Sequence, residues 1–282
     1  MPGRGHDKHD RHDRHDGTGD SMGPRGLLED KVVLVNGGTQ GVGAAVARAA
    51  VREGAVVAVT GRRPEPGEEL VAELTAAGGR AMFVRADLAD AGQAKGAVAE
   101  AVSAYGRIDC LVNSAGLTSR GTLLDTTPEL FDAHVAVNLK GPFFAMQAAV
   151  ADMLARKAPG TIVNIITSSA HGGQPFLAPY VAAKAGLAGL TRNAAHAHRF
   201  DRVRINGLNI GWTATEGEDA TQRAFHGAGD DWREQAAARL PMGRLGQPDE
   251  IADFVVLLLS ERSGVVTGSV IDWDQNVLGG LD

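Results

Sequence analysis

The stretch Lys31-Val-Val-Leu-Val35-Asn36-Gly37-Gly38-Thr39-Gln40-Gly41-Val42-Gly43 decides the fold. An apolar, β-branched run ends in a glycine turn, and an alanine-rich segment with helical character follows over residues 44–51. In this order the glycines allow a tight turn and the close approach of a phosphate, whose charge the helix N-terminus favours. The sequence therefore predicts a dinucleotide site here, although many such turns only join a strand to a helix. The residues assigned to the site are Gly37, Thr39, Gln40, Gly41, Val42 and Gly43.

The remaining chain alternates strand-like and helix-like segments, which is typical of a doubly wound parallel sheet. With the first run, the apolar segments predict seven strands, the others lying at residues 56–59, 81–84, 108–112, 161–166, 203–208 and 269–271. Helices are expected at residues 68–77, 93–105, 128–156, 179–198 and 249–259. We therefore expect an α/β protein, a single-domain Rossmann fold whose seven-stranded parallel sheet is flanked by helices, over residues 27–282.

Composition limits the classes of function. The 282 residues are 44% hydrophobic, with 37 glycines and 11 prolines, and such a chain suffices for one large core. The net charge of −6 gives no basic footprint for nucleic acid. No apolar run approaches the roughly 20 residues that a membrane span needs. Cys110 lies in an apolar run with no second cysteine to pair with, so we expect a buried thiol in a reducing cytoplasm.

Residues 1–26 differ from the rest of the chain. Histidine and aspartate recur every three residues between positions 6 and 16, and glycines flank them. The segment has nothing to bury, so we predict a disordered tail. Its imidazoles and carboxylates could capture a divalent ion, but no other ligand cluster completes a site and we predict no metal centre. It also lacks the apolar segment of a secretory signal.

Tyr180-Val181-Ala182-Ala183-Lys184 sets a phenol and an ammonium four residues apart in an alanine-rich helical run. Positions i and i+4 share a helix face, so the two groups point the same way. A free tyrosine has a pKa of about 10, too high for a base near neutral pH, and a nearby cation favours the phenolate. The pair suits proton transfer to or from an alcohol oxygen. Alone the spacing is weak evidence, because it also arises by chance on solvated helices.

Several further segments occur in one order along the chain. The glycine turn is followed by Asp87-Leu88 after the third strand, by Asn113-Ser114-Ala115-Gly116, by Asn138 and then by the Tyr-x3-Lys element. This order resembles the short-chain dehydrogenase/reductase family over about residues 27–277.

The resemblance implies roles for these residues. Asp87 and Leu88 would contact the adenine, and Asn138 would hold a water that links Lys184 to solvent. Asn113 would steady the sheet and, with its neighbours, line the cofactor. The implied catalytic residues are Asn138, Thr167, Tyr180 and Lys184, and the implied cofactor contacts beyond the glycine turn include Asp87, Leu88, Asn113, Ala115, Gly116, Tyr180 and Lys184.

Two positions depart from the family pattern. Thirteen residues before the tyrosine the family usually has a serine that binds the substrate oxygen, and here Thr167 stands there, followed by Ser168. A threonine hydroxyl donates and accepts as a serine does, although its methyl stiffens χ1. We favour Thr167 over Ser168 from the strand register. The second departure is Ile210-Gly211, where the family usually has Pro-Gly, so the loop loses a fixed φ. Gly211, Thr213 and Thr215 remain expected cofactor contacts.

The end of the second predicted strand bears on cofactor choice. An acidic residue there would bind the ribose 2′-hydroxyl and favour NAD, but Gly61 is followed by Arg62 and Arg63. A guanidinium fork fits a 2′-phosphate, so we expect NADP, with NAD possible. The alternative is that both arginines are solvated.

The substrate is expected to be a small molecule. His171 and Gln174 belong to the loop beside the catalytic hydroxyl, and Trp212 belongs to a segment that could close as a lid. With Thr167, Ser168 and Tyr180, these residues suit a polar cyclic substrate such as a sugar, a cyclitol or a polyketide-like ring. The predicted activity is interconversion of a secondary alcohol and a ketone. An epimerase or dehydratase on the same scaffold, and a dinucleotide-binding protein without catalysis, are the alternatives.

The resemblance also implies an assembly. Members of the family commonly form tetramers through the long helices, so we expect a homotetramer or a homodimer. The apolar face of the predicted helix 179–198 fits this, and it fits packing within one chain equally well.

Overall fold

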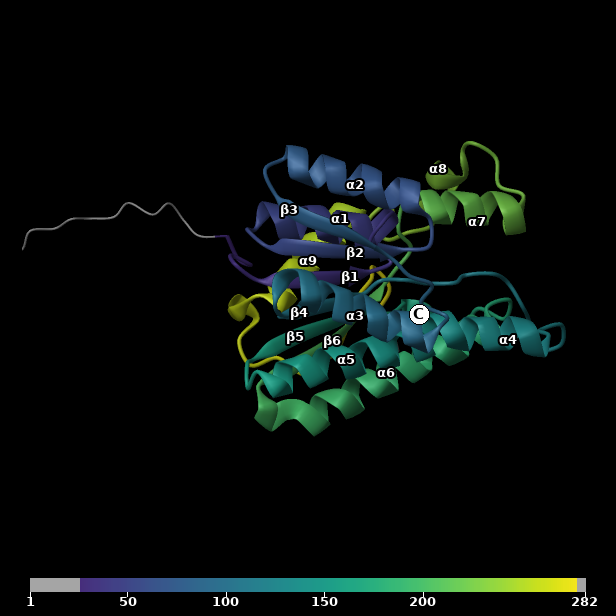
Figure 1. Cartoon of the computed structure of the whole chain (residues 1–282). Helices are drawn as coiled ribbons and strands as arrows, with labels where there is room; N and C mark the ends of the chain where they lie inside the picture. Colours follow the sequence, from purple (N-terminus) through teal and green to yellow (C-terminus); the bar gives the residue numbers. More distant parts are fainter. Residues whose placement is uncertain (1–25, 278–282) are drawn as a thin grey trace, which may run out of the picture.

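The computed structural model describes residues 26–277 and is built on one sheet (Figure 1). The seven strands are all parallel and follow the order β3-β2-β1-β4-β5-β6-β7, so the predicted fold class is confirmed. The chain order reverses between β1 and β4, and the crevice at such a reversal is where open α/β sheets bind ligands. The strands are β1 (Val32–Asn36), β2 (Val56–Gly61), β3 (Arg80–Arg85), β4 (Cys110–Asn113), β5 (Gly160–Ile165), β6 (Val203–Ile210) and β7 (Val270–Trp273).

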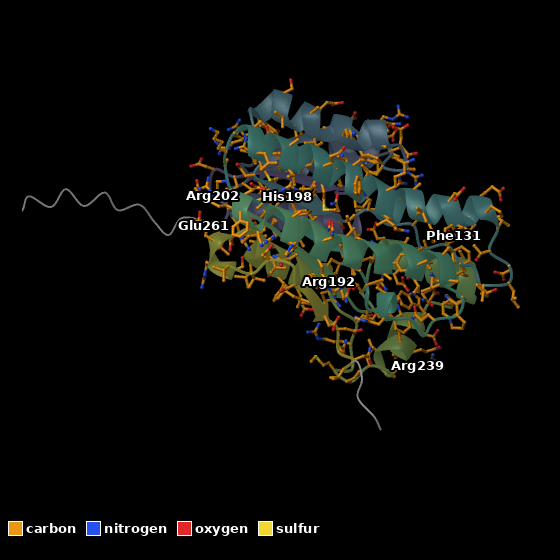
Figure 2. All side chains as sticks on the ribbon, turned by 90° about the horizontal axis from the view of Figure 1, so that it is seen from below. Phe131, Arg192, His198, Arg202, Arg239 and Glu261 are labelled. Carbon is orange, nitrogen blue, oxygen red and sulfur yellow. The ribbon has the colours of Figure 1, made fainter. Side chains whose placement is uncertain are left out.

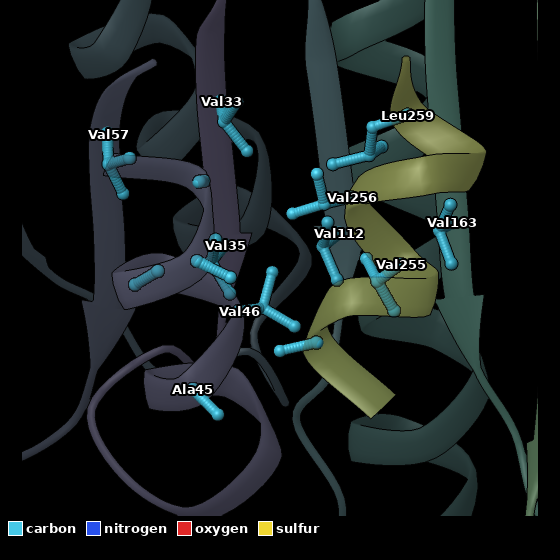
Figure 3. Close-up of a cluster of buried hydrophobic side chains, with 14 of the residues drawn as sticks. Val33, Val35, Ala45, Val46, Val57, Val112, Val163, Val255, Val256 and Leu259 are labelled. Atoms are coloured by element: carbon cyan, nitrogen blue, oxygen red, sulfur yellow. The ribbon is translucent and has the colours of Figure 1, made fainter. Parts of the chain in front are cut away.

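Helices cover both faces of the sheet, which is why β1 and β4 are apolar and buried along their full length. In Figure 1 one face carries α1 (Gly41–Arg52), α2 (Pro64–Ala76) and α9 (Pro248–Leu259). The opposite face carries α3 (Ala91–Tyr105), α5 (Gly141–Ala155) and α6 (Ala178–His198). On the first face, Val46 of α1 and Val255 of α9 meet the valines of β1, β4 and β5 in one continuous core (Figure 3).

The helix predicted over residues 128–156 is wrong in one respect, because it is interrupted. The structure has α4 (Pro128–Val135), a π-helical turn η1 (Ala136–Lys140) and then α5. Pro142 cannot donate a hydrogen bond, and its ring excludes the carbonyl four residues back. The N–H of Gly141 instead donates to the oxygen of Ala136, five residues back. The wider turn carries Asn138, and such turns occur often at functional sites.

The segment expected as a lid contains two helices that the sequence analysis did not predict, α7 (Glu216–His226) and α8 (Trp232–Ala237). In Figure 1 they lie together at the upper right, beside the ends of α1 and α2. Thr215 caps α7 by accepting from the N–H of Glu218 at 3.0 Å. Short 3-10 turns complete the fold at η2 (Ser168–His171), η3 (Arg199–Asp201) and η4 (Glu261–Ser263).

Two further expectations concern the tail and Cys110. Apart from Gly26, the predicted disordered tail lies outside the described residues. Cys110 is a free, buried thiol on β4, and burial raises its pKa to about 12. Over residues 26–277, no helix has both the length and the apolar character of a membrane span.

Candidate functional site

A cavity of about 1260 Å³ lies at the carboxyl ends of the strands and is bounded by the glycine turn, the loops after β4 and β5, and the α7–α8 segment. Arg239, which follows α8, lines it, and Figure 2 shows this residue at the opposite side of the molecule from Arg202, which precedes β6. Most predicted site residues line the cavity, namely Gly37, Thr39, Gln40, Gly41, Val42, Gly43, Arg62, Arg63, Asp87, Leu88, Ala115, Gly116, Thr167, Ser168, Gln174, Tyr180, Lys184, Gly211, Trp212, Thr213 and Thr215.

The glycine turn forms a cradle of backbone along the cavity, and at two positions it is packed too closely against the chain itself to carry a side chain. Gly37 has φ +72°, and a Cβ built there would lie 2.6 Å from the backbone of Ala115. A Cβ at Gly43 would overlap the carbonyl oxygen of Gly37. The backbone at both positions is therefore bare, and the turn runs directly into the N-terminus of α1. Bare backbone before a helix N-terminus fits the pyrophosphate of a dinucleotide.

The residues on either side of this cradle fit the rest of a dinucleotide. One carboxylate oxygen of Asp87 accepts from the N–H of Ala89 at 3.0 Å, which fixes the side chain at the rim of the cavity. At the end of β2, Arg62 and Arg63 are exposed at the cavity edge, and Arg63 Nη2 donates to Gln40 Oε1 at 2.8 Å. No carboxylate occupies the end of β2.

Three asparagines join β1, β4 and β5 beneath the cavity. Asn36 Nδ2 donates to Asn113 Oδ1 at 3.0 Å, and Asn113 Nδ2 donates to Asn164 Oδ1 at 2.8 Å. Asn164 in turn donates to Thr191 of α6 at 2.9 Å. Asn113 was predicted to line the cofactor, but its side chain is 3% exposed and does not line the cavity. Its amide is fully engaged between neighbouring strands, so it acts by holding the sheet in place.

Tyr180 and Lys184 stand at the start of α6 and both line the cavity. The Lys184 Nζ lies 5.9 Å from the centroid of the Tyr180 ring and donates to the carbonyl oxygen of Ile165 at 2.8 Å. The lysine is 3% exposed. The predicted pairing of phenol and ammonium on one helix face is therefore present, beside the glycine cradle.

The electrostatics of this pair differ from the expectation that Lys184 lowers the pKa of Tyr180. Burial raises the pKa of Tyr180 to about 12, against smaller opposing effects of the Thr167 hydroxyl and the Arg120 guanidinium. Burial also lowers the pKa of Lys184 to about 8. The prediction from helix spacing accounted for the closeness of the two groups. It left out the free energy of removing both charged forms from water, which disfavours each of them.

Of the two candidate hydroxyls, that of Thr167 acts on the phenol of Tyr180. Its hydrogen bond lowers the pKa of Tyr180, and no such effect comes from Ser168. Its Oγ1 also accepts from the N–H of Ser169 at 3.2 Å, which fixes the side chain at the start of η2. Both Thr167 and Ser168 line the cavity, and the geometry supports the preference for Thr167.

Asn138 is buried behind the reacting groups and does not line the cavity. Its Oδ1 accepts from the N–H of Leu117 and its Nδ2 donates to the Leu117 oxygen, both at 3.0 Å. Nδ2 also lies 3.3 Å from His134 Nδ1. The sequence analysis missed His134, which is fully buried and meets the Tyr180 ring edge-on at a centroid distance of 6.1 Å. Asn138 thus ties the π-helical turn to the loop after β4.

The loop after β6 is held firmly despite Ile210 in place of a proline. The N–H of Gly211 donates to the Trp273 oxygen at 3.0 Å, and Thr213 Oγ1 donates to the Gly211 oxygen at 2.9 Å. Ala214 adds a backbone bond to Gly246 at 2.9 Å. Hydrogen bonds to β7 and to the loop before α9 replace the rigidity that a proline would supply.

The substrate side of the cavity contains Gln174 and Trp212 as predicted, but not His171. The His171 ring points to the surface and lies 3.0 Å from Asp272 Oδ1. Glu218, His226 and Trp232, which belong to the segment expected as a lid, also line the cavity. Further polar lining residues escaped the prediction because they lie on a loop and on the unpredicted helices, where no periodic pattern marks them. They include Arg120, Gln222, Gln235 and Arg239.

Comparisons with known proteins show which enzymes the chain is similar to. A family model described as enoyl-(acyl carrier protein) reductase matches residues 37–276. The L-rhamnose 1-dehydrogenase (NAD(P)(+)) of Azotobacter vinelandii is 36% identical over 249 residues, covering 86% of this chain and 94% of that protein. The 3-oxoacyl-[acyl-carrier-protein] reductase of Staphylococcus aureus is 34% identical over 242 residues, covering 86% of this chain and 95% of that protein. A crystal structure of an actinorhodin polyketide ketoreductase variant with NADPH is 30% identical with a TM-score of 0.83, covering 87% of this chain and 96% of that one.

Proposed function

The chain belongs to the short-chain dehydrogenase/reductase family and is an NAD(P)-dependent oxidoreductase, and from this premise we propose that it interconverts a secondary alcohol and a ketone on a polar cyclic substrate. The observation that carries the proposal is the position of Tyr180 and Lys184 in the same cavity as the glycine cradle. A nicotinamide dinucleotide held on that cradle would supply or accept the hydride.

Each catalytic residue has a separate task. Tyr180 donates its phenolic proton to the carbonyl oxygen in reduction and receives the alcohol proton in oxidation. Thr167, fixed by its bond to Ser169, donates a hydrogen bond to the same substrate oxygen. Lys184 uses one of its three N–H donors on Ile165, so two remain for the phenol and for a ribose hydroxyl. Asn138 positions the loop after β4 against the π-helical turn η1.

Replacing Tyr180 by phenylalanine tests the proposal. We expect Tyr180→Phe to lose at least about 100-fold in kcat, because general acid–base catalysis contributes on that scale. Dinucleotide binding should persist, because the cradle is untouched. The assay is nicotinamide absorbance with a panel of sugars, cyclitols and aromatic ketones. Turnover by the variant at the wild-type rate on a confirmed substrate would contradict the assignment of Tyr180.

An epimerase or dehydratase remains the second candidate, because the cavity holds a further carboxylate, that of Glu218. In an epimerase the hydride returns to the substrate, so the product changes with no net change in nicotinamide absorbance. Analysis of products by chromatography beside the absorbance assay separates the two reactions. An intact Tyr180 and Lys184 pair argues against a protein that only binds dinucleotide.

We propose NADP as the preferred cofactor. The support is the pair of exposed arginines at the end of β2, Arg62 and Arg63, together with the absence of a carboxylate there. A guanidinium binds a 2′-phosphate by charge-assisted hydrogen bonds. The test compares Michaelis constants for NADP and NAD in the wild type and in the Arg62→Ala, Arg63→Ala double variant. The double variant should lose the preference for NADP over NAD. A wild type that strongly prefers NAD would refute the proposal.

We also propose a homotetramer or a homodimer, located in the cytoplasm. Apolar side chains are exposed on the helices that follow β4, with Phe131 44%, Phe143 42% and Leu154 40% exposed. A second copy of the chain would cover them. Light scattering of the purified protein gives the mass, and Phe143→Glu should lower it if this face is the interface. A monomer at micromolar concentration would rule the assembly out.

A further inference from the structure

Arg120 lies on the loop after β4 and lines the substrate side of the cavity. Its Nη1 donates to the oxygen of Thr118 at 2.7 Å. Its Nε and Nη2 both donate to His226 Nε2, at 3.2 and 3.0 Å. Among residues 26–277, no carboxylate comes within the 4.0 Å of an ion pair with this guanidinium. The guanidinium therefore forms no ion pair with a described residue, and the Glu218 carboxylate acts on its charge only from a greater distance, where it raises the pKa of Arg120.

The hydrogen bonds of Arg120 leave part of its fork unused. A guanidinium has five N–H donors, and the contacts to Thr118 and His226 engage three of them. The two that remain belong one to each terminal nitrogen. A pair of donors on adjacent nitrogens of a planar group matches the two oxygens of a carboxylate.

The surroundings of Arg120 make a bound anion favourable. The guanidinium carbon lies 5.4 Å from the ring centroid of Phe176 and 5.8 Å from that of Phe225. Partial burial lowers its pKa, which reports that the charge has lost part of its hydration. A charge that is desolvated and unpaired gains more from a counter-ion than a solvated one does.

Arg120 also acts on the reacting group, so it lies close to where the substrate must sit. It lowers the pKa of Tyr180, whereas Glu218 raises it. The Oε1 of Glu218 is held by the indole of Trp212 at 2.8 Å and by the amide of Gln222 at 2.7 Å. The carboxylate of Glu218 is thus held by hydrogen bonds from Trp212 and Gln222 and makes no hydrogen bond with Arg120. The guanidinium of Arg120 faces the cavity.

We propose that Arg120 binds a carboxylate of the substrate, so that the preferred substrates are small cyclic oxo acids and the corresponding hydroxy acids. The carboxylate would lie away from the reacting carbon and would receive the two unused N–H groups of the guanidinium. This inference rests on the proposed oxidoreductase function for its substrate class, but the anion subsite itself can be measured without turnover.

Binding of a matched pair of ligands tests the subsite. Oxocyclohexanecarboxylate and its carboxamide have nearly the same shape and differ in charge. Calorimetry with the full chain and NADP should give a dissociation constant at least tenfold lower for the carboxylate, since hydrogen bonds to charged groups are worth about twice neutral ones. In Arg120→Met the two constants should agree within about twofold. Arg120→Lys should keep part of the preference, because a lysine has the charge without the fork.

Two control variants separate this role from others. If Arg120 served only to hold α7 through His226, then His226→Ala would remove the preference for the carboxylate ligand, as Arg120→Met does. We expect His226→Ala to keep this preference. If Arg239 were the anion site, Arg239→Met would remove it, and we again expect retention. Equal binding of the two ligands to the wild type, or no saturable binding of the carboxylate, would overturn the proposal. Binding without turnover of any ketone would instead reject the proposed reaction and leave the subsite in place.

Discussion

Replacing Lys184 by methionine should make the stability of the protein depend differently on pH. Lys184 is 3% exposed, and its ammonium donates a hydrogen bond to the oxygen of Ile165. Burial lowers its pKa from 10.5 to about 8, which corresponds to about 3 kcal/mol at 1.36 kcal/mol per unit. At neutral pH the folded protein therefore carries a charge that the unfolded chain accommodates better.

The sign follows from proton binding. Between about pH 8 and pH 10.5 the unfolded chain holds the Lys184 proton more tightly than the folded protein does, so wild-type stability rises with pH in this window. Lys184→Met lacks the group and lacks this rise. The free energy of unfolding of the wild type, minus that of the variant, should increase by about 2–3 kcal/mol from pH 7 to pH 10. The lost bond to Ile165 adds an offset that does not vary with pH.

Urea unfolding followed by tryptophan fluorescence at several pH values measures this difference. Lys140→Met is the matched control, because it makes the same substitution at an exposed lysine, at the end of η1. The difference in the free energy of unfolding between the wild type and Lys140→Met should stay constant with pH. A difference for Lys184→Met that also stays constant, within about 0.5 kcal/mol, would show that burial does not disfavour this ammonium. The same variant should have no measurable oxidoreductase activity.

Three further predictions concern the cradle and the residues behind it. Gly37→Ala should raise the dissociation constant for dinucleotide at least tenfold and lower the free energy of unfolding by about 2–4 kcal/mol. Gly78→Ala is the control, because Gly78 also has a positive φ, +85°, but a Cβ added there would meet no atom within 4 Å. The control should lower the free energy of unfolding by about 1 kcal/mol and leave binding unchanged. Asn113→Ala should lower stability by about 2–4 kcal/mol in urea unfolding, because it removes one hydrogen-bond partner from each of the buried amides of Asn36 and Asn164. Asn138→Ala should lower kcat by up to about 100-fold with a smaller change in the Michaelis constant for cofactor, since it frees the Leu117 backbone; an unchanged kcat would exclude a positioning role.

The fold was predictable because its strongest signals are local and repeated. Valine-rich runs without alternation, such as Val32–Asn36, belong to strands covered on both faces, and alternation with helical segments implies parallel connections. The glycine turn marks a place where backbone must stay bare. These features depend on neighbours in the sequence, so reading the sequence sufficed for all seven strands and for the position of the crevice.

Features that no periodic apolar pattern marks were missed. The sequence around Asn138 keeps a continuous helical character, and only the effect of Pro142 on the hydrogen bond four residues back produces the π-helical turn. Helix α7 is rich in charge and has only Thr221 buried, so too few apolar residues mark it as a helix in the sequence. Arg120 lies on a loop, where position alone decides what it contacts. The substrate side of the site is built largely from such elements.

The opposed pKa shifts of Tyr180 and Lys184 bear on the direction of the reaction. Because burial raises one and lowers the other, the first proton lost from the pair as pH rises comes from Lys184, and the phenol stays protonated. A protonated phenol is the form that reduction of a ketone requires. Arg120 is one of two groups that favour the phenolate, the other being Thr167. A carboxylate bound at Arg120 would offset that influence, so an oxo acid would strengthen the acid form of Tyr180 on binding. On this argument the chain's own residues keep Tyr180 in the form that donates a proton, most of all when a carboxylate occupies the Arg120 subsite.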